Sequence, residues 1–368
     1  MSFTTNYAEI VSKIDDIDPV KYGQTRNYLS GAVTQLSPYI SRGVISTKQI
    51  AQMVLSKGYN PKQIDSFLKE LAWRDYFQKV WVQKGDGIDT DLKQIQPNFT
   101  NKQLPKSIFN ASTGINAIDK GIIELKETGY MHNHLRMYVA SIACNIAKSH
   151  WQMPAKWMYY YLLDADWASN ALSWQWVASS FSNKKYFANQ ENINKYCNDT
   201  QQNTFLDISY ENLENINTPE ILHNLCNFDL KTELPFQQQL NLDLNIPTYL
   251  YNFYNLDCEW DATINANRIL LLEPSFFERY SVCKQTISFV LDLAKNIDNI
   301  QVYIGEFDDL KFELADSKIH FKEHPTAKHY LGILHNRDWM FEEVVDYYPS
   351  FFAYWKKCEK FLAINFKY

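Results

Sequence analysis

The first 198 residues consist largely of long segments with helical periodicity, joined by short connections. Pro61 suits the first turn of one segment, and Gly129 suits the position just beyond the end of another. Because short loops between long helices are typical of helical bundles, residues 1–198 are predicted to form one all-α domain. The segments with this pattern are PKQIDSFLKELAWRDYFQKVWVQ (61–83), ASTGINAIDKGIIELKETG (111–129), MHNHLRMYVASIACNIAKSH (131–150) and PAKWMYYYLL (154–163).

The pattern changes after residue 198. Residues 199–245 are polar and are predicted to form a linking segment with some helix. From about residue 246, RILLLEP (268–274) and IQVYIGEF (300–307) read as strands on either side of a helix, CKQTISFVLDLAKNI (283–297). Such a strand–helix–strand unit predicts a parallel pair of strands. The chain is therefore expected to be mostly α, with the all-α domain followed by a smaller α/β domain over residues 246–368.

The composition is that of a globular protein, with 46% hydrophobic and 15% aromatic residues. No apolar run reaches the roughly 18–20 residues of a membrane span, and the N-terminus lacks the basic start and apolar core of a signal peptide. We therefore expect a cytoplasmic protein without a membrane partner. The six cysteines never occur in CxxC pairs, which favours reduced thiols over a metal site, although dispersed cysteines can still converge in space.

The net charge of −6 conceals two unlike halves of the chain. Residues 1–198 hold 22 Lys and Arg against 16 Asp and Glu, whereas residues 199–368 hold 14 against 26. Only the first part is suited to a polyanion such as DNA. Chance clustering of charge on solvated faces is the alternative.

Three segments of the helical part place polar groups among aromatic ones. In LLDADWASNALSWQWVA (162–178), two aspartates and an asparagine share a short stretch with three tryptophans. Buried carboxylates are costly unless something pairs with them. Helical spacing also groups Glu70, Trp73 and Arg74 on one face, and places Asn133 and Arg136 on a second helix. An ion pair beside a core aromatic explains any one group, but all three together predict a planar, polar ligand.

The run GAVTQLSPYISRG (31–43) offers hydroxyl and backbone N–H groups near the start of a helix. Such groups suit a phosphate. A capped helix turn explains the run equally well, since it contains no glycine-rich phosphate motif.

These motifs resemble those of the DNA photolyase and cryptochrome family, in the family's order, over about residues 20–190. DADWASNALSWQWVA resembles its flavin-binding signature. ELAWRDYF (70–77), TGYMHNHLRM (128–137), the tryptophan of SHW (149–151) and VTQLSPYISRG resemble its other motifs. The resemblance implies an all-α photolyase-type domain that binds a folded FAD, and it implies UV-damaged DNA as partner. We expect a monomer.

Carried to this sequence, the resemblance implies a role for each matching residue. Asn170 would bind flavin N5, Trp174 and Trp151 would relay electrons, and Trp167 is left as packing. A flipped pyrimidine dimer would lie between Trp73 and Trp176. The implied FAD contacts are Tyr22, Thr34, Gln35, Leu36, Ser37, Arg74, Asn133, Arg136, Asp164, Asp166, Asn170 and Trp174, with Asp164 close to Arg136. The implied lesion or DNA contacts are Glu70, Arg26, Trp73, Met137 and Trp176.

The sequence departs from the family's pattern at several positions. Gln35 replaces the usual phosphate-loop arginine, and Leu172-Ser173 replaces a Gly-Gly pair. A third relay tryptophan is missing near Asn98 or Phe99, where a tyrosine or Trp157 is a possible substitute. The family's antenna domain precedes its flavin domain, but here only about 20 residues do so.

The stretch LLLEPSFFERYSVCKQTISFVLDLAKNIDNIQVYIGEF (270–307) resembles part of that antenna domain. It suggests a permuted or reduced antenna-like domain at the C-terminal side. Whether that domain holds a second pigment is not readable from the sequence.

The resulting hypothesis is a light-driven, FAD-dependent photolyase that repairs pyrimidine dimers by electron transfer from reduced flavin. Repair of (6-4) products in this family relies on an active-site histidine pair, whereas only His132 and His134, separated by Asn133, lie nearby. Cyclobutane dimers are therefore favoured as the substrate. One alternative is a cryptochrome-like blue-light photoreceptor that binds FAD without repair, and another is a DNA-binding or structural module without flavin.

Overall fold

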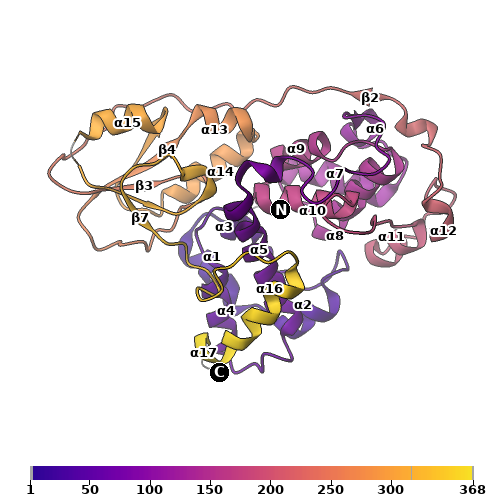
Figure 1. Ribbon diagram of the computed structural model, residues 1–368, viewed down its shortest axis with the longest axis horizontal. Helices are drawn as coiled ribbons and strands as arrows, with labels where there is room; N and C mark the ends of the chain where they lie inside the picture. The colour runs from indigo at the N-terminus through magenta and orange to yellow at the C-terminus, as the bar shows by residue number, and fades with distance from the viewer. Residues whose placement is uncertain (1–2, 316, 367–368) are drawn as a thin grey trace. The chain divides into compact units, whose positions relative to one another are not determined.

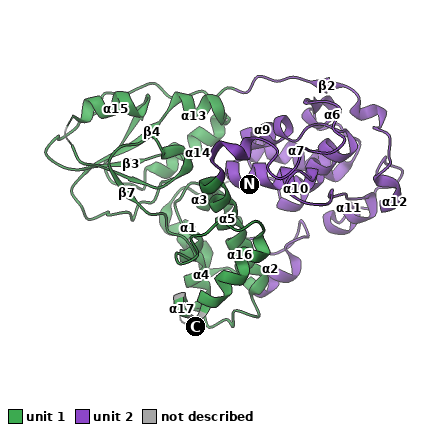
Figure 2. Cartoon of the chain, viewed as in Figure 1, with its two compact units in different colours: residues 1–19, 34–83, 231–368 green, residues 20–33, 84–230 purple. Residues whose placement is uncertain are grey.

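The computed structural model describes residues 3–315 and 317–366. Its contacts divide the chain into two compact units, coloured separately in Figure 2. Unit 1 contains residues 1–19, 34–83 and 231–368, and unit 2 contains residues 20–33 and 84–230. The units therefore do not follow the linear boundaries predicted at residues 198 and 245.

The reason is that residues 34–83 pack against the C-terminal part of the chain. The backbone N–H of Met340 donates to Asp75 Oδ2 at 2.8 Å. Gly43 has a φ of +64°, and a Cβ there would lie 2.6 Å from the Tyr254 carbonyl oxygen, so only glycine permits this approach. Contacts between segments distant in sequence thus place the first long helices in the same unit as the sheet.

Unit 2 is built from helices (Figure 1). The helix predicted to stop at Gly129 is confirmed, since Gly129 adopts a left-handed φ of 72° and its N–H bonds to the Leu125 carbonyl. The single helix predicted over 131–150 is wrong, because the α-helix ends at Ser141 and gives way to a π-helical turn. The main helices are α7 (Asn116–Thr128), α8 (Asn133–Ser141), the π-helix η2 (Ile142–Ile146), α9 (Gln152–Tyr161), α10 (Trp167–Ala178) and α11 (Gln190–Cys197).

The first part of the predicted linking segment belongs to unit 2. A two-stranded antiparallel pair joins Leu104 to Cys226 and Pro105 to Leu225, which ties this segment to the helical core. The smaller elements of unit 2 are η1 (Gly85–Asp89), β1 (Leu104–Pro105), α6 (Lys106–Phe109), α12 (Tyr210–Leu213), η3 (Glu220–Leu222) and β2 (Leu225–Cys226). The helix α2 (Pro19–Thr25) starts at the boundary between the units.

The helical part of unit 1 contains the helix predicted over residues 61–83, but it begins at Asp65. Residues before it form a separate turn, because Asn60 accepts hydrogen bonds from the Lys62 N–H at its side chain and from the Gln63 N–H at its carbonyl. The helices here are α1 (Tyr7–Asp15), α3 (Ser37–Ser41), α4 (Thr47–Leu55), α5 (Asp65–Lys84), α16 (Phe351–Cys358), η5 (Glu359–Phe361) and α17 (Leu362–Asn365).

Unit 1 also contains a five-stranded parallel sheet in the order β5-β4-β3-β6-β7. Figure 1 labels β3, β4 and β7 of this sheet. The predicted parallel pair is confirmed, with Leu270 opposite Val302. Every residue of β4 is buried, as is typical of a central parallel strand. The strands are β3 (Thr248–Tyr251), β4 (Asn267–Leu272), β5 (Ile300–Ile304), β6 (Ile319–Lys322) and β7 (Ile333–His335). The helices and turn around them are α13 (Pro274–Arg279), α14 (Lys284–Ala294), α15 (Phe307–Leu314) and η4 (Pro325–Ala327).

This strand order is that of a doubly wound sheet. Strands β4 and β5 are added on one side of β3, and β6 and β7 are then added on its other side. Leu250, Ile269 and Leu271 form one apolar cluster with Phe307 and Leu310 of α15, so α15 covers one face of the sheet. The carboxyl ends of β3 and β6 meet at the reversal point, where ligands bind in open sheets of this type.

Candidate functional site

The residues predicted to bind ligand are divided between the two units. Unit 1 holds Thr34, Gln35, Leu36, Ser37, Glu70, Trp73 and Arg74. Unit 2 holds Tyr22, Arg26, Asn133, Arg136, Met137, Trp151, Asp164, Asp166, Asn170, Trp174 and Trp176.

The two aspartates before α10 have different protein partners. Asp164 is 6% exposed and pairs with Arg136, with 3.0 Å between Oδ2 and Nη2. Arg136 Nε also donates to the Met131 carbonyl at 2.7 Å. Asp166 is the N-cap of α10, where its Oδ1 accepts from the Ser169 N–H at 2.7 Å. The predicted proximity of Asp164 and Arg136 is confirmed, and an ion pair and a helix cap explain how both carboxylates are tolerated.

Asn170 is 9% exposed on the first turns of α10. Its Nδ2 donates to the Ala155 carbonyl at 2.9 Å, which joins α10 to α9 and holds the amide in one orientation. On the same turn, the buried hydroxyl oxygen of Ser169 has no hydrogen-bond partner among the described residues. Such a group is costly to leave unpaired, and a polar ligand at this end of α10 would satisfy it.

The tryptophans of unit 2 are mostly buried. Trp151 and Trp167 are fully buried and Trp174 is 2% exposed, whereas Trp176 is 39% exposed. Trp174 and Trp176 are two positions apart on α10, so they project to different sides of the helix. The ring of Trp176 lies 5.7 Å from that of Tyr186. Trp176 therefore presents accessible aromatic surface, while the other three indoles lie inside the unit.

Two carboxylates that sequence reasoning missed bind the indoles of this unit. Asp91 Oδ1 accepts from Trp151 Nε1 at 2.8 Å, and Asp89 Oδ1 accepts from Trp167 Nε1 at 2.6 Å. The indole rings themselves lie 6.5 Å apart between centroids. The sequence feature that could have pointed to these two carboxylates is the acidic stretch DGIDTD (86–91), which follows the end of α5.

Two histidines lie at the start of α8, of which His132 is buried and His134 is half-buried. His132 Nδ1 accepts from the His134 N–H at 3.1 Å and caps the helix. Burial lowers the pKa of both imidazoles to about 4, and the positive charge of Arg26 contributes to the lowering at His134. Both rings are therefore neutral at pH 7. The ring of His134 lies 4.7 Å from that of Tyr138 and 4.8 Å from that of Tyr196.

Remaining predicted residues of unit 2 lie around these groups. Tyr22 lies on α2 and Arg26 directly follows it, while Asn133 and Met137 lie on α8 with Arg136. Asn133 is exposed, whereas Tyr22, Arg26 and Met137 are half-buried. The structure thus brings Arg26 near the histidines and Arg136 to Asp164.

In unit 1, the half-buried Trp73 packs against an aromatic ring that is distant in sequence. Its ring lies parallel to that of Phe351 on α16, with 3.9 Å between centroids and 10° between planes. Sequence reasoning missed this contact, because the two residues are 278 positions apart in the sequence. One face of Trp73 is therefore covered by protein.

The other predicted residues of unit 1 lie on α5 and in the loop before α3. Arg74 Nη2 donates to Ser41 Oγ, and Glu70 is half-buried one turn before it. In the loop, Gln35 adopts a left-handed φ of 54° and Leu36 is 1% exposed. The Leu36 N–H bonds to Thr34 Oγ1 at 3.4 Å, so the loop is a hydroxyl-stabilised turn before Ser37 begins α3.

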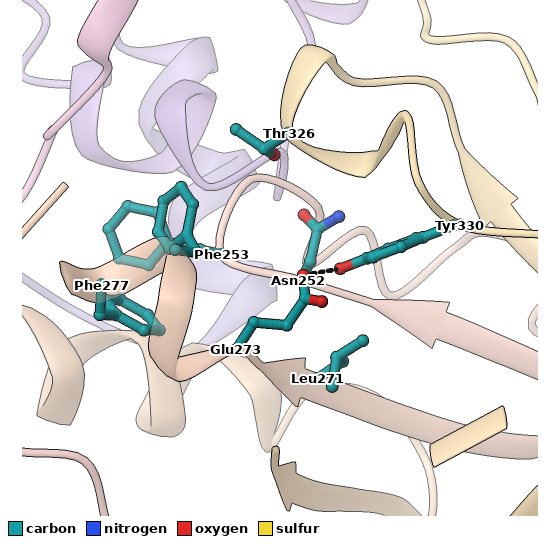
Figure 3. A pocket seen from close by; sticks show the side chains of 8 residues that line it. Asn252, Phe253, Leu271, Glu273, Phe277, Thr326 and Tyr330 are labelled. Carbon is teal, nitrogen blue, oxygen red and sulfur yellow. Dashed lines mark hydrogen bonds between the residues drawn. The ribbon is translucent and has the colours of Figure 1, made fainter. Parts of the chain in front are cut away.

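At the carboxyl ends of the parallel strands, Glu273 is 5% exposed and accepts three hydrogen bonds. Figure 3 shows the one from Tyr330. The donors are Tyr330 Oη at 2.9 Å, His329 Nε2 at 2.7 Å and the Phe307 N–H at 3.1 Å. The hydrogen bond to Glu273 raises the pKa of His329. A cavity of about 10 Å³ beside it, also lined by Asn252, has space for about one water molecule.

Within residues 3–315 and 317–366, no group of three or more His, Cys, Asp or Glu side chains is placed to hold a metal ion. All six cysteines are free thiols. No helix in the same residues is long and apolar enough to cross a membrane.

Residues 67–229 match the FAD binding domain of DNA photolyase. This match covers most of unit 2, together with part of α5. Through these residues, the chain is similar to members of the DNA photolyase and cryptochrome family.

Relatives named as photo-lyases and relatives named as cryptochromes both match this region. A deoxyribodipyrimidine photo-lyase from Alkalihalophilus pseudofirmus is 32% identical over 149 residues, which cover 40% of this chain and 31% of the relative. A cryptochrome DASH from Gloeobacter violaceus is 32% identical over 173 residues, 43% of this chain and 33% of the relative. The match thus spans about a third of the length of these relatives. A solved cryptochrome from Synechocystis aligns over 53% of this chain and 44% of its own, with 25% identity and a TM-score of 0.48.

Proposed function

We propose that this protein is a light-driven, FAD-dependent enzyme that repairs pyrimidine dimers in UV-damaged DNA. The observation that carries the proposal is the conjunction, at the start of α10, of the Arg136–Asp164 ion pair with the anchored Asn170. This conjunction lies inside the segment that matches the FAD binding domain of DNA photolyase. The relatives named as photo-lyases support the choice of reaction.

The polar groups of α8 and α10 fit such a cofactor. FAD, when bound, supplies the light absorption and the transferable electron that side chains lack. Arg136, fixed by Asp164 and the Met131 carbonyl, presents its guanidinium in one orientation, which suits a phosphate or a ring oxygen. The Asn170 amide is held against Ala155, and the unpartnered Ser169 hydroxyl offers a further hydrogen bond.

The proposal also includes the remaining FAD contacts that the resemblance implies. They are Tyr22, Thr34, Gln35, Leu36, Ser37, Arg74, Asn133, Asp166 and Trp174, with Trp174 and Trp151 as electron carriers.

For the substrate, we propose that the exposed ring of Trp176 and the free surface of Trp73 stack on a flipped pyrimidine dimer. Base–aromatic stacking contributes about 1–3 kcal/mol per base. Glu70 would accept a hydrogen bond from the lesion, and Arg26 and Met137 would give further contacts. Cyclobutane dimers are favoured over (6-4) products, because the nearby histidines, His132 and His134, are separated by Asn133 and do not match the active-site pair on which (6-4) repair relies in this family.

For the α/β part, we propose a permuted antenna-like domain, supported by its doubly wound parallel sheet. The proposal also includes a monomeric state and a cytoplasmic location.

A cryptochrome-like photoreceptor without repair is the second candidate. It is favoured by the contact that places Phe351 on one face of Trp73, and by Gln35 in the loop where the family has an arginine.

Reconstitution and a repair assay separate the candidates. The purified chain is loaded with FAD, fully reduced, and illuminated with an oligonucleotide that carries one cyclobutane dimer. We expect flavin absorbance and light-dependent restoration of the pyrimidines. A loaded and reduced protein that restores none identifies the photoreceptor, and a colourless protein that takes up no FAD contradicts both.

A further inference from the structure

We propose that Trp151 and Trp167 form a redox pair in which Asp91 and Asp89 take up the indole protons. The inference rests on the proposed function, because a light-excited, oxidised flavin would be the oxidant. It assigns a role to Trp167, and it makes two aspartates outside the family motifs part of the electron path.

The geometry that carries the inference lies entirely within unit 2. Each indole N–H donates to its own carboxylate, at 2.8 Å for Trp151 with Asp91 and at 2.6 Å for Trp167 with Asp89. The two rings are inclined by 35° with centroids 6.5 Å apart. Both indoles are fully buried. An electron can therefore pass directly between them, and each has a base in contact with its acidic proton.

Trp157 provides an internal contrast. It is also fully buried, but its Nε1 has no hydrogen-bond partner among the described residues. Removing an electron from an indole creates a positive charge, which is unfavourable in a buried site without a counter-charge. A carboxylate on the N–H relieves that charge. Trp151 and Trp167 are therefore easier to oxidise than Trp157.

A buried indole N–H needs a hydrogen-bond acceptor, but that acceptor does not need to be charged. A backbone carbonyl or an amide oxygen would serve, whereas here both acceptors are carboxylates at distances typical of charge-assisted hydrogen bonds. Asp89 and Asp91 are also only half-buried, so a proton that they accept can reach solvent.

Asp91 is held in place by further contacts. Its Oδ2 accepts from the Gln96 N–H at 3.0 Å, and its Oδ1 lies 3.4 Å from His150 Nε2. Trp167 in turn makes an edge contact with Tyr159, with centroids 5.4 Å apart. The Asp91 carboxylate and the Trp167 ring are thus held in place before oxidation occurs.

The steps balance in electrons and protons. Oxidation of Trp151 removes one electron, and its Nε1 proton moves to Asp91 Oδ1, which leaves a neutral indole radical and a neutral carboxylic acid. Trp167 then gives one electron to Trp151 as the proton returns from Asp91 to Trp151 Nε1. The Nε1 proton of Trp167 moves to Asp89 Oδ1, so one electron and one proton have left Trp167.

The test uses flash photolysis of the FAD-loaded chain, with the absorption of the cationic and neutral tryptophan radicals as the readout. In wild type we expect the neutral radical. Asp91→Asn and Asp89→Asn keep an acceptor oxygen but remove the base, so we expect the cationic radical to persist in both. Trp167→Phe should lose the radical on Trp167, whereas Trp157→Phe, the matched control, should leave the signal unchanged.

A readout without flavin checks the hydrogen bonds themselves. Ultraviolet resonance Raman spectra of the flavin-free chain should lose a strongly hydrogen-bonded indole signal in Trp151→Phe and in Trp167→Phe, but not in Trp157→Phe.

If the FAD-loaded Asp91→Asn and Asp89→Asn variants show the same radical absorption as wild type, the redox pair is overturned. The proposed repair function would not be affected by that result. Loss of the radical in Trp157→Phe would overturn it as well. A chain that takes up no FAD would contradict the proposed function and the redox pair together.

Discussion

The indole of Trp73 and the phenyl ring of Phe351 are stacked, with 3.9 Å between centroids and 10° between planes. Phe351 also lies nearly parallel to Trp355, at 6.3 Å and 16°. A column of three rings thus joins α5 to α16. Because we propose that Trp73 contacts a flipped pyrimidine, α16 and the lesion would share the surface of one indole.

Replacement of Phe351 by alanine tests both aspects of this column. Phe351 is 2% exposed, so the loss of packing should lower the free energy of unfolding by about 3–5 kcal/mol. If α16 competes with the lesion, affinity for a dimer-containing oligonucleotide should rise. Denaturant unfolding and a binding titration measure the two effects.

Its neighbour Phe352 is the control, since it is 73% exposed. Phe352→Ala should change the free energy of unfolding by no more than about 0.5 kcal/mol. Unchanged lesion affinity in Phe351→Ala would argue that α16 and DNA use different surfaces of Trp73.

The ion pair before α10 is expected to be important for stability. Asp164→Ala leaves the mostly buried Arg136 without its carboxylate, which typically costs about 3–5 kcal/mol when a buried pair is broken. The exposed pair of Asp292 and Lys295 serves as the control, and Asp292→Ala should cost less than about 1 kcal/mol. Equal stability losses in urea unfolding would show that Arg136 finds another partner.

The histidines at the start of α8 predict a loss of stability in acid. Their pKa is about 4 in the folded protein, against about 6.5 in an unfolded chain. Between these values the unfolded state binds more protons, so the free energy of unfolding should fall as the pH drops from about 6.5 towards 4. Protonation of His132 Nδ1 also removes the cap that accepts from the His134 N–H.

Urea unfolding across this pH range compares wild type with His134→Phe. Phenylalanine preserves an aromatic ring against Tyr138 and Tyr196 but cannot titrate. We therefore expect a shallower dependence of stability on pH in the variant. Identical pH profiles would mean that His134 is not held neutral by the fold.

Glu273 is expected to link three segments of the α/β part. Glu273→Gln removes one acceptor oxygen and should leave a buried donor unpaired, at a cost of about 1–3 kcal/mol. The exposed Glu278 on α13 provides the control, and Glu278→Gln should leave stability nearly unchanged. A Glu273→Gln variant as stable as the control would show that the three donors find other partners.

Glu273→Gln should also change how the free energy of unfolding depends on pH, with a sign opposite to that expected for His132 and His134. Because the bond to Glu273 raises the pKa of His329, this contribution is complete below the unfolded pKa of about 6.5 and is lost as the pH rises through the folded value. It should disappear in Glu273→Gln. The measurement is the free energy of unfolding at mildly acidic and alkaline pH.

Much of the local structure could be predicted from the sequence, because its determinants lie within a few residues of each other. Gly129 ends α7 because only a residue tolerant of a positive φ fits there. The apolar run of β4 predicted a buried parallel strand beside β5. The family motifs led to the pair of Asp164 with Arg136.

Contacts between distant segments were decided by the tertiary structure alone. The stacking of Phe351 on Trp73, and the carboxylates of Asp89 and Asp91 on the buried indoles, have no periodicity or spacing that announces them. The same holds for the division of the first 198 residues between two units. The physical reason is that caps and strands depend on backbone geometry and neighbouring residues, whereas side-chain partners depend on which surfaces the packed chain brings into contact.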